Sequence, residues 1–131
     1  MSNSEDSAIL SKYFHDWSVE QGDEVMPGDL IWRFTGEELQ VIRAEIAPGS
    51  KFQLHQHPQE QIIVVLQGAL NFTVGSETRI VKAGGVIHAP SGILHGGDAW
   101  GDEVVVTLEA FHPPRKDFGA ESHKVNLTNP Q

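Results

Sequence analysis

The chain has 131 residues, the length of one compact domain with a single hydrophobic core. Its 18 Asp and Glu residues outnumber 9 Lys and Arg residues, and the formal net charge of -9 opposes unguided binding to nucleic acid or to an anionic membrane surface. No cysteine is present, which excludes disulfides, thiol nucleophiles and thiolate metal ligands.

Residues 1–6 are polar and acidic and lack the basic start and apolar stretch of a signal peptide. The longest unbroken apolar run, 62–66, is far shorter than the ~20 residues that a membrane-spanning helix needs. The absence of cysteine also fits a reducing compartment. We therefore expect a soluble, cytoplasmic protein without a membrane or nucleic-acid partner.

Residues 1–24 are expected to form an N-terminal extension. Its aromatic residues Tyr13, Phe14 and Trp17 are spaced for a short amphipathic helix or for a segment lying across the domain. We expect this extension to act in packing or as a dimer contact.

Short apolar runs separated by Gly, Pro, Asn or Asp follow, and this alternation is typical of an all-β sandwich or barrel. Two prolines, Pro113 and Pro114, end the last run. The main domain is expected to span 25–118, followed by a mobile tail at 119–131. The predicted strands are 30–34, 39–46, 51–57, 61–66, 69–74, 78–81, 86–89 and 103–111.

Three of the seven histidines form a pattern that suits a metal site. His55 and His57 lie two apart on a predicted strand, so both imidazoles face the same side. A tight turn at 90–92 then brings His95. Convergent nitrogen ligands with one position left open suit a catalytic transition metal.

The other histidines are expected to play different parts. We read His15, His112 and His123 as ordinary core or surface residues, because most histidines are half-buried without binding a ligand. His88 precedes Pro90 by two residues, and it is a candidate to face the cavity as a substrate-binding group.

At this point the spacing resembles a known family. The pattern G-x5-H-x-H-x3-Q-x6-G from Gly49 to Gly68 resembles the first cupin motif, and G-x5-P-x-G-x2-H from Gly84 to His95 resembles the second. This resemblance implies a single-domain cupin, a small antiparallel β-barrel of the double-stranded β-helix or jelly-roll type that forms dimers. It also implies one divalent transition metal inside the barrel, bound by His55, His57, Gln61 and His95.

Most members of the family carry Glu at the position of Gln61, and Glu60 is adjacent. The interval to Gly68 places Gln61 at the motif position, and alternation points Glu60 to the other face, so we expect Gln61 to be the ligand. Neutral ligands leave the ion its full charge, which makes a stronger Lewis acid and a better trap for an anion. Such ligands suit nickel, zinc, iron and manganese.

The stretches 57–61 and 111–118 are most similar to the KdgF-type pectin-degradation cupins. This resemblance implies conversion of unsaturated monouronates to linear keto sugars. The acidic residue, Phe and Arg of that group fall on Glu109, Phe111 and Arg115. Glu109 stands where Asp is usual, so its carboxylate reaches one methylene further.

Strand alternation supports a cavity around the same residues. Gln53 shares a face with His55 and His57, so we expect it to line the cavity. Glu109 and Phe111 share a face of the last strand, and the planar fork of Arg115 suits a carboxylate. The alternatives are an exposed rim charge for Glu109 and a solvated tail pair with Asp117 for Arg115. The expected catalytic residues are Glu109, Arg115 and Phe111, and the expected substrate-binding residues are Gln53, Arg115, Phe111 and His88.

The hypothesis is therefore a metal-dependent isomerase of uronate metabolism that acts on a small anionic sugar acid. The alternatives are an iron-dependent dioxygenase, a polyketide-cyclase-like enzyme, and a non-catalytic module that binds or senses a small anion.

Overall fold

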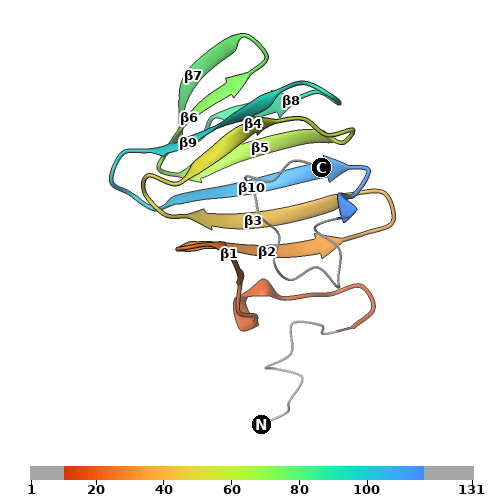
Figure 1. Cartoon of the computed structure of the whole chain (residues 1–131). Helices are drawn as coiled ribbons and strands as arrows, with labels where there is room; N and C mark the ends of the chain where they lie inside the picture. Colours follow the sequence, from red (N-terminus) through yellow and green to blue (C-terminus); the bar gives the residue numbers. More distant parts are fainter. Residues whose placement is uncertain (1–10, 117–131) are drawn as a thin grey trace.

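A computed structural model describes residues 11–116 of the chain, and nearly all of its regular structure is β (Figure 1). Within this range a single 3₁₀ turn, η2 (Trp17–Val19), precedes the strands. No helix in the described range is long and apolar enough to cross a membrane. The strands are β1 (Asp23–Met26), β2 (Asp29–Thr35), β3 (Gln40–Ile46), β4 (Lys51–His55), β5 (Glu60–Gln67), β6 (Ala69–Val74), β7 (Glu77–Lys82), β8 (Val86–Ala89), β9 (His95–Trp100) and β10 (Val105–His112).

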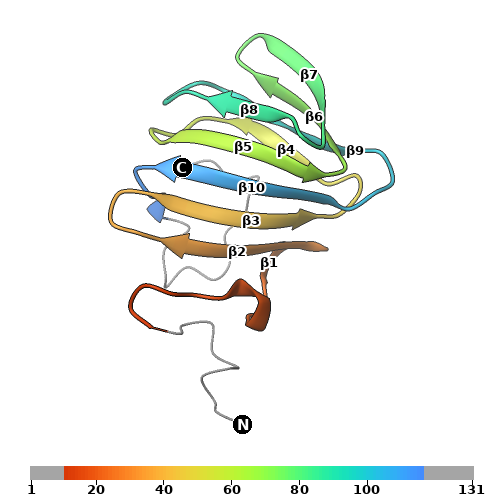
Figure 2. The same cartoon turned by 180° about the vertical axis from the view of Figure 1, so that it is seen from behind.

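The strands form two antiparallel sheets that face each other. The six-stranded sheet has the order β1-β2-β3-β10-β5-β8, and the four-stranded sheet has the order β4-β9-β6-β7. Figures 1 and 2 show the first sheet running from β1 at one edge to β8 at the other. Strands that neighbour each other in space but not in sequence, such as β3 and β10, produce a jelly roll. The all-β barrel expected from the sequence is confirmed.

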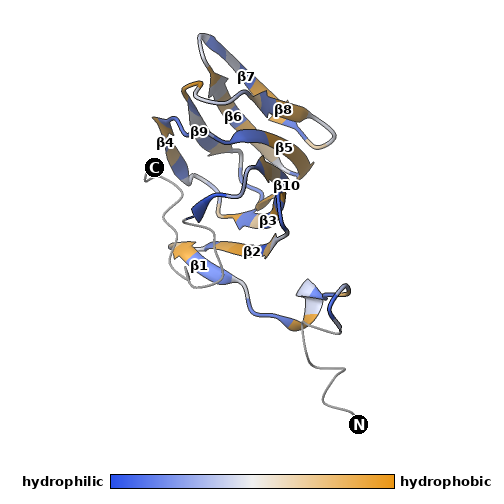
Figure 3. Ribbon diagram, turned by 90° about the vertical axis from the view of Figure 1, so that its right-hand side faces the viewer, coloured by the Kyte–Doolittle hydropathy of each residue, from blue (hydrophilic) through white to orange (hydrophobic). Residues whose placement is uncertain are grey.

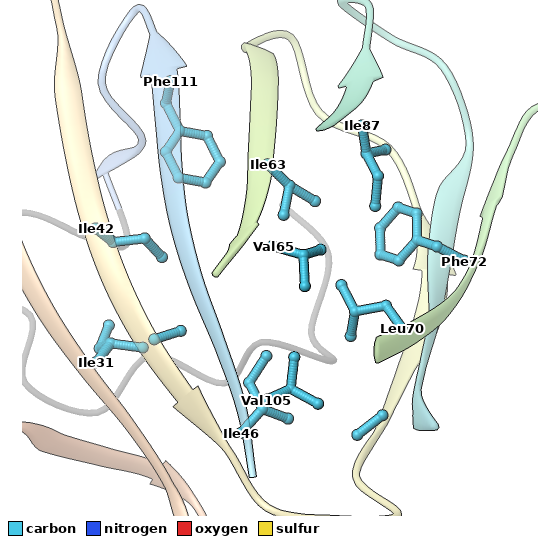
Figure 4. Close-up of a cluster of buried hydrophobic side chains, with 12 residues drawn as sticks. Ile31, Ile42, Ile46, Ile63, Val65, Leu70, Phe72, Ile87, Val105 and Phe111 are labelled. Atoms are coloured by element: carbon cyan, nitrogen blue, oxygen red, sulfur yellow. The ribbon is translucent and has the colours of Figure 1, made fainter. Parts of the chain in front are cut away.

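The hydrophobic core lies between the sheets because alternate strand residues point inward. On β3, Ile42, Ala44 and Ile46 are buried while the residues between them are partly exposed. Full burial of one such large apolar side chain stabilises the fold by about 1.5–3 kcal/mol. Figure 4 shows the side chains that meet in this core, among them Ile31, Ile42, Ile63, Val65, Leu70, Phe72, Ile87, Val105 and Phe111.

The sequence reading missed two strands, β1 and β9. Residues 96–98 of β9, Gly-Gly-Asp, have the composition of a turn, yet they pair with β4 on one side and β6 on the other. A Cβ added at Gly96 would lie 2.7 Å from the carbonyl oxygen of Gln53, and one at Gly97 would overlap the carbonyl oxygen of Asn71. The glycines are therefore required by close backbone approach and not by a turn.

We expect Gly97→Ala to destabilise the protein by about 3 kcal/mol or more, because the added methyl meets backbone that is fixed by strand pairing. Gly36→Ala is the matched control: its Cβ would meet nothing nearer than the Leu39 carbonyl oxygen at 3.3 Å, so the loss should stay under about 1 kcal/mol. Chemical denaturation of both variants measures the difference. Equal free energies of unfolding would contradict this account of β9.

The described part of the N-terminal extension lies beside the barrel, next to β1 and β2 (Figure 3). It contains one 3₁₀ turn and not the amphipathic helix that the aromatic spacing allowed. The Asp16 side chain caps this turn by accepting a hydrogen bond from the Ser18 amide. The Trp17 indole donates to the Arg33 carbonyl oxygen, and the His15 ring lies 4.5 Å from the Phe34 ring. Tyr13 and Phe14 are exposed. The dimer contact and the boundaries of the 25–118 domain stay predictions, and the 119–131 tail lies outside the described residues.

Candidate metal centre

Pairing of β4 with β9 brings His55 and His95 together. His55 ends β4 and His95 begins β9, and the two residues are direct cross-strand partners. His57 follows in the loop between β4 and β5. All three imidazoles are buried, and one nitrogen of each lies within 4.8 Å of those of the others. The expected histidine cluster is therefore present in the barrel.

A β-bulge sets which residues of β4 face this cluster. Between the pairs Phe52↔Gly97 and His55↔His95, β4 advances one residue more than β9. Phe52 therefore shares the inner side with His55, while Gln53 is exposed. Contrary to the expectation from alternation, Gln53 lies outside the cavity. Its backbone carbonyl nevertheless accepts a hydrogen bond from His55 Nδ1 at 2.8 Å.

The backbone sets the tautomer of each histidine. Nδ1 of His55, His57 and His95 lies 2.8, 3.0 and 2.9 Å from the carbonyl oxygens of Gln53, Gln59 and Ile93. A carbonyl oxygen only accepts, so each Nδ1 carries the proton and donates it. The lone pair of each neutral ring is therefore on Nε2, which is the arrangement found in metal-binding histidines.

Gln61 adds an oxygen to the same point. Its Nε2 donates to Glu109 Oε1 at 2.8 Å, which directs the amide oxygen toward the histidines. Oε1 lies 3.1 Å from His57 Nε2 and 3.0 Å from His95 Nε2. Because each of these atoms presents a lone pair, the contacts are favourable only with a cation or a proton between them.

Burial disfavours the proton. It lowers the pKa of His57 and lowers that of His95 to about 4, and the positive charge of Arg115 also contributes to both shifts. Neutral imidazoles together with an amide oxygen are ligands that divalent transition metals accept. The residues that would hold the ion are His55, His57, Gln61 and His95.

Glu60 and His88 are placed on the other side of the sheet. Both are exposed, and His88 Nε2 lies 2.7 Å from Glu60 Oε2. His88 therefore does not line the cavity, contrary to its candidacy as a substrate-binding group, because its position on β8 faces outward. His15 and His112 also lie away from the cluster, while His123 and Asp117 lie outside the described residues.

The cavity beside the histidines has a volume of about 40 Å³. Three of the residues expected to act on a substrate line it, namely Glu109, Phe111 and Arg115. Its other walls are largely apolar, formed by Phe52, Ile63, Leu70 and Phe72 among others. The cavity thus has one acidic group, one basic group and the metal ligands in an otherwise apolar chamber.

Glu109 is held in place by two donors. Gln61 Nε2 donates to its Oε1, and Thr107 Oγ1 donates to its Oε2, each at 2.8 Å. Burial raises the pKa of Glu109, whereas the two hydrogen bonds and the charge of Arg115 act in the opposite direction. Glu109 is thus a cavity residue and not a charge on an exposed rim.

Arg115 is 3% exposed, which excludes a solvated tail residue. Its guanidinium carbon lies 5.5 Å from the centroid of the Phe111 ring, and that ring lies 6.1 Å from the His57 ring. The Phe111 ring therefore lies near both the guanidinium and the His57 imidazole.

The sequence reading missed two further residues near this cavity. Gln40 and Gln59 are buried glutamines that contact the segment carrying Arg115. Gln40 lies outside both histidine motifs, and Gln59 occupies an unspecified position between His57 and Gln61, so no sequence signal marks either residue.

The class of protein is thus a jelly-roll β-barrel with three histidines and an amide placed inside it where they could hold a metal ion. The family model described as the cupin domain matches residues 42–111, and the chain belongs to this family. A comparison with curated proteins found no match.

Solved structures show the same fold. KdgF from a Halomonas species is 25% identical with a TM-score of 0.72, and the match covers 76% of this chain and 92% of that one. An RmlC-like cupin from Shewanella frigidimarina NCIMB 400 is 20% identical with a TM-score of 0.76, covering 83% of this chain and 97% of the other. The single-domain cupin identity that the motifs suggest is confirmed, with KdgF among its structural neighbours.

Proposed function

We propose that this cupin is a metal-dependent enzyme that opens the ring of unsaturated monouronates and releases linear keto sugars. The observation that carries the proposal is the network in which Glu109 accepts hydrogen bonds from Gln61 and Thr107 in the cavity that Arg115 lines. The similarity to KdgF at 25% identity supports the same reaction class.

His55, His57, Gln61 and His95 would hold one divalent ion, for which nickel, zinc, iron and manganese all fit the ligands. When bound, the ion supplies Lewis acidity toward a substrate oxygen. Because all four ligands are neutral, its charge adds to that of Arg115. The cavity thereby attracts an anion although the chain as a whole has a net charge of -9.

The size of the cavity limits what enters it. Its volume of about 40 Å³ suits a few water molecules or a carboxylate with a neighbouring oxygen. We propose that the uronate carboxylate enters and binds Arg115, while the rest of the sugar lies toward the mouth and Phe111 forms an apolar wall.

The reaction is an isomerisation and needs no oxidant. A proton leaves the anomeric hydroxyl, the bond between the anomeric carbon and the ring oxygen breaks, and an aldehyde and an enolate form. The same proton is then returned to the alkene carbon of the enolate, which becomes a ketone. Glu109 is the group proposed to take the first proton and return it, as a general base and then a general acid.

Incubation of metal-loaded protein with unsaturated galacturonate or the alginate-derived monouronate tests the proposal. The enol-ether absorbance should fall faster than in the spontaneous reaction, and chelation should remove the difference. Oxygen consumption would indicate a dioxygenase instead, and recovery of unchanged bound ligand would indicate a binding or sensing module. Size-exclusion chromatography and cell fractionation test the proposed homodimer and cytoplasmic location.

Gln61→Glu tests the importance of a neutral ligand. The new carboxylate should keep the metal but cancel part of its charge, and it would also lie beside Glu109. We expect about tenfold weaker binding of an anionic ligand, a cost of about 1.4 kcal/mol. Gln67→Glu adds the same charge at the exposed end of β5 and should leave affinity within about twofold. Titration calorimetry with malonate measures both, and equal affinities would contradict the role given to Gln61.

A further inference from the structure

The segment after β10 reaches the cavity without strand pairing. Strand β10 ends at His112, and Arg115 lies three residues later with its side chain in the cavity wall. An arginine side chain has many rotamers, and a charge buried there must be held in one place to bind an anion tightly. Something other than a sheet has to fix the backbone at this point.

Gln40 contacts both backbone polar groups of Arg115. Its Oε1 accepts a hydrogen bond from the Arg115 amide at 3.1 Å, and its Nε2 donates to the Arg115 carbonyl oxygen at 3.4 Å. The Gln40 side chain is 1% exposed, and its Nε2 also donates to Thr35 Oγ1 at 3.0 Å. Gln40 thus acts toward Arg115 as a neighbouring strand would.

Gln59 makes a second, longer contact with the same segment. Its Nε2 donates to the Pro114 carbonyl oxygen at 3.4 Å. Its own carbonyl accepts from His57 Nδ1. The loop that orients a metal ligand is thereby joined to the segment that carries the arginine.

We infer that Gln40, assisted by Gln59, is a positioning residue that holds Arg115 in the orientation needed to bind an anion beside the metal. This inference rests on the proposed function, because it assumes that an anionic ligand binds Arg115. Gln40 does not line the cavity, and its side chain is linked to the lining residue Arg115 through hydrogen bonds to the Arg115 backbone. Fixing the backbone in advance lowers the ordering cost when the ligand binds.

Gln40→Met is the informative variant, since methionine nearly preserves the side-chain volume but removes the amide. Three measurements are made on full-length protein loaded with zinc: metal content, affinity for malonate, and hydrogen exchange of the backbone amides of Arg115 and Lys116, since Pro113 and Pro114 have no amide proton. Val105→Ala, a core substitution near the far end of β10, controls for a general loss of stability.

We expect Gln40→Met to keep its zinc, to exchange the Arg115 amide at least about tenfold faster, and to bind malonate about tenfold more weakly. Val105→Ala should lower the melting temperature but keep malonate affinity within about twofold. Gln59→Met should give a smaller loss of affinity in the same direction. In an Arg115→Met background, Gln40→Met should change affinity by less than about twofold, because a residue that acts through Arg115 has nothing left to position.

The outcomes separate the two proposals. If wild type and Arg115→Met bind malonate equally, the anion site itself is absent and the proposed function fails together with this inference. If Arg115→Met weakens binding but Gln40→Met does not, the function stands and the inference is overturned. Equal effects of Gln40→Met with and without Arg115, or unchanged exchange of the Arg115 amide, would also overturn it.

Discussion

His95→Ala is expected to release the metal almost completely. The imidazole is 1% exposed, its Nδ1–H donates to the Ile93 carbonyl oxygen, and its Nε2 points toward Gln61 Oε1. Alanine provides no ligand atom, so only His55, His57 and Gln61 of the converging ligands would remain. The loss in affinity should exceed the 10- to 100-fold that is typical when only an outer-shell partner of a metal ligand is removed.

Elemental analysis of the purified variant beside His88→Ala is the measurement. Both substitutions remove one imidazole from the same barrel, but His88 is an exposed outer residue paired with Glu60. His88→Ala should therefore retain the wild-type metal content. The His95 variant should still fold, because the substitution also removes the contact between two lone-pair atoms, His95 Nε2 and Gln61 Oε1. A circular dichroism spectrum typical of β structure would check this. Equal metal content in the two variants would refute the metal centre.

The histidine site was predictable because it depends on short intervals along the chain. His55 and His57 are separated by one residue, and the second motif brings His95 to the strand that pairs with His55. Strand alternation also placed Glu109 and Phe111 on one face of the last strand, and both line the cavity because β10 is regular along this part.

Strand alternation gave the wrong side for a residue whose orientation is set by pairing between strands that are far apart in the sequence. Gln53 turns outward because β4 bulges against β9, and a bulge depends on a partner strand that the sequence did not reveal. Strand β9 itself was missed because Gly96 and Gly97 have the composition of a turn. The buried Arg115 is hydrogen-bonded through its backbone to Gln40, which lies 75 positions away in the chain.

The second large effect is expected at Glu109, the proposed proton carrier. Glu109→Gln keeps the shape of the side chain and removes its ability to exchange a proton. A loss of about 10²–10⁴-fold in kcat is expected when a general acid-base group is removed. Metal content should not change, since Glu109 contacts the ligand Gln61 and is not itself among the converging ligands.

The local network can accept this substitution. The new amide oxygen can take the hydrogen bond from Gln61 Nε2, and the new amide nitrogen can donate to Thr107 Oγ1, because a hydroxyl both donates and accepts. A loss of activity would therefore report on the missing carboxylate and not on a collapsed site. Glu109→Asp retains the carboxylate one methylene further back, so it should recover part of the lost rate.

Glu60→Gln is the matched control, because it neutralises a carboxylate on the next strand that faces outward and pairs with His88. It should keep kcat within about twofold of wild type, as expected for an exposed surface group. The assay follows the enol-ether absorbance of unsaturated galacturonate under saturating substrate. If Glu109→Gln and Glu60→Gln turned over equally fast, the proton would have to be carried by another group. In that case the metal centre would stand, but the assignment of Glu109 would not.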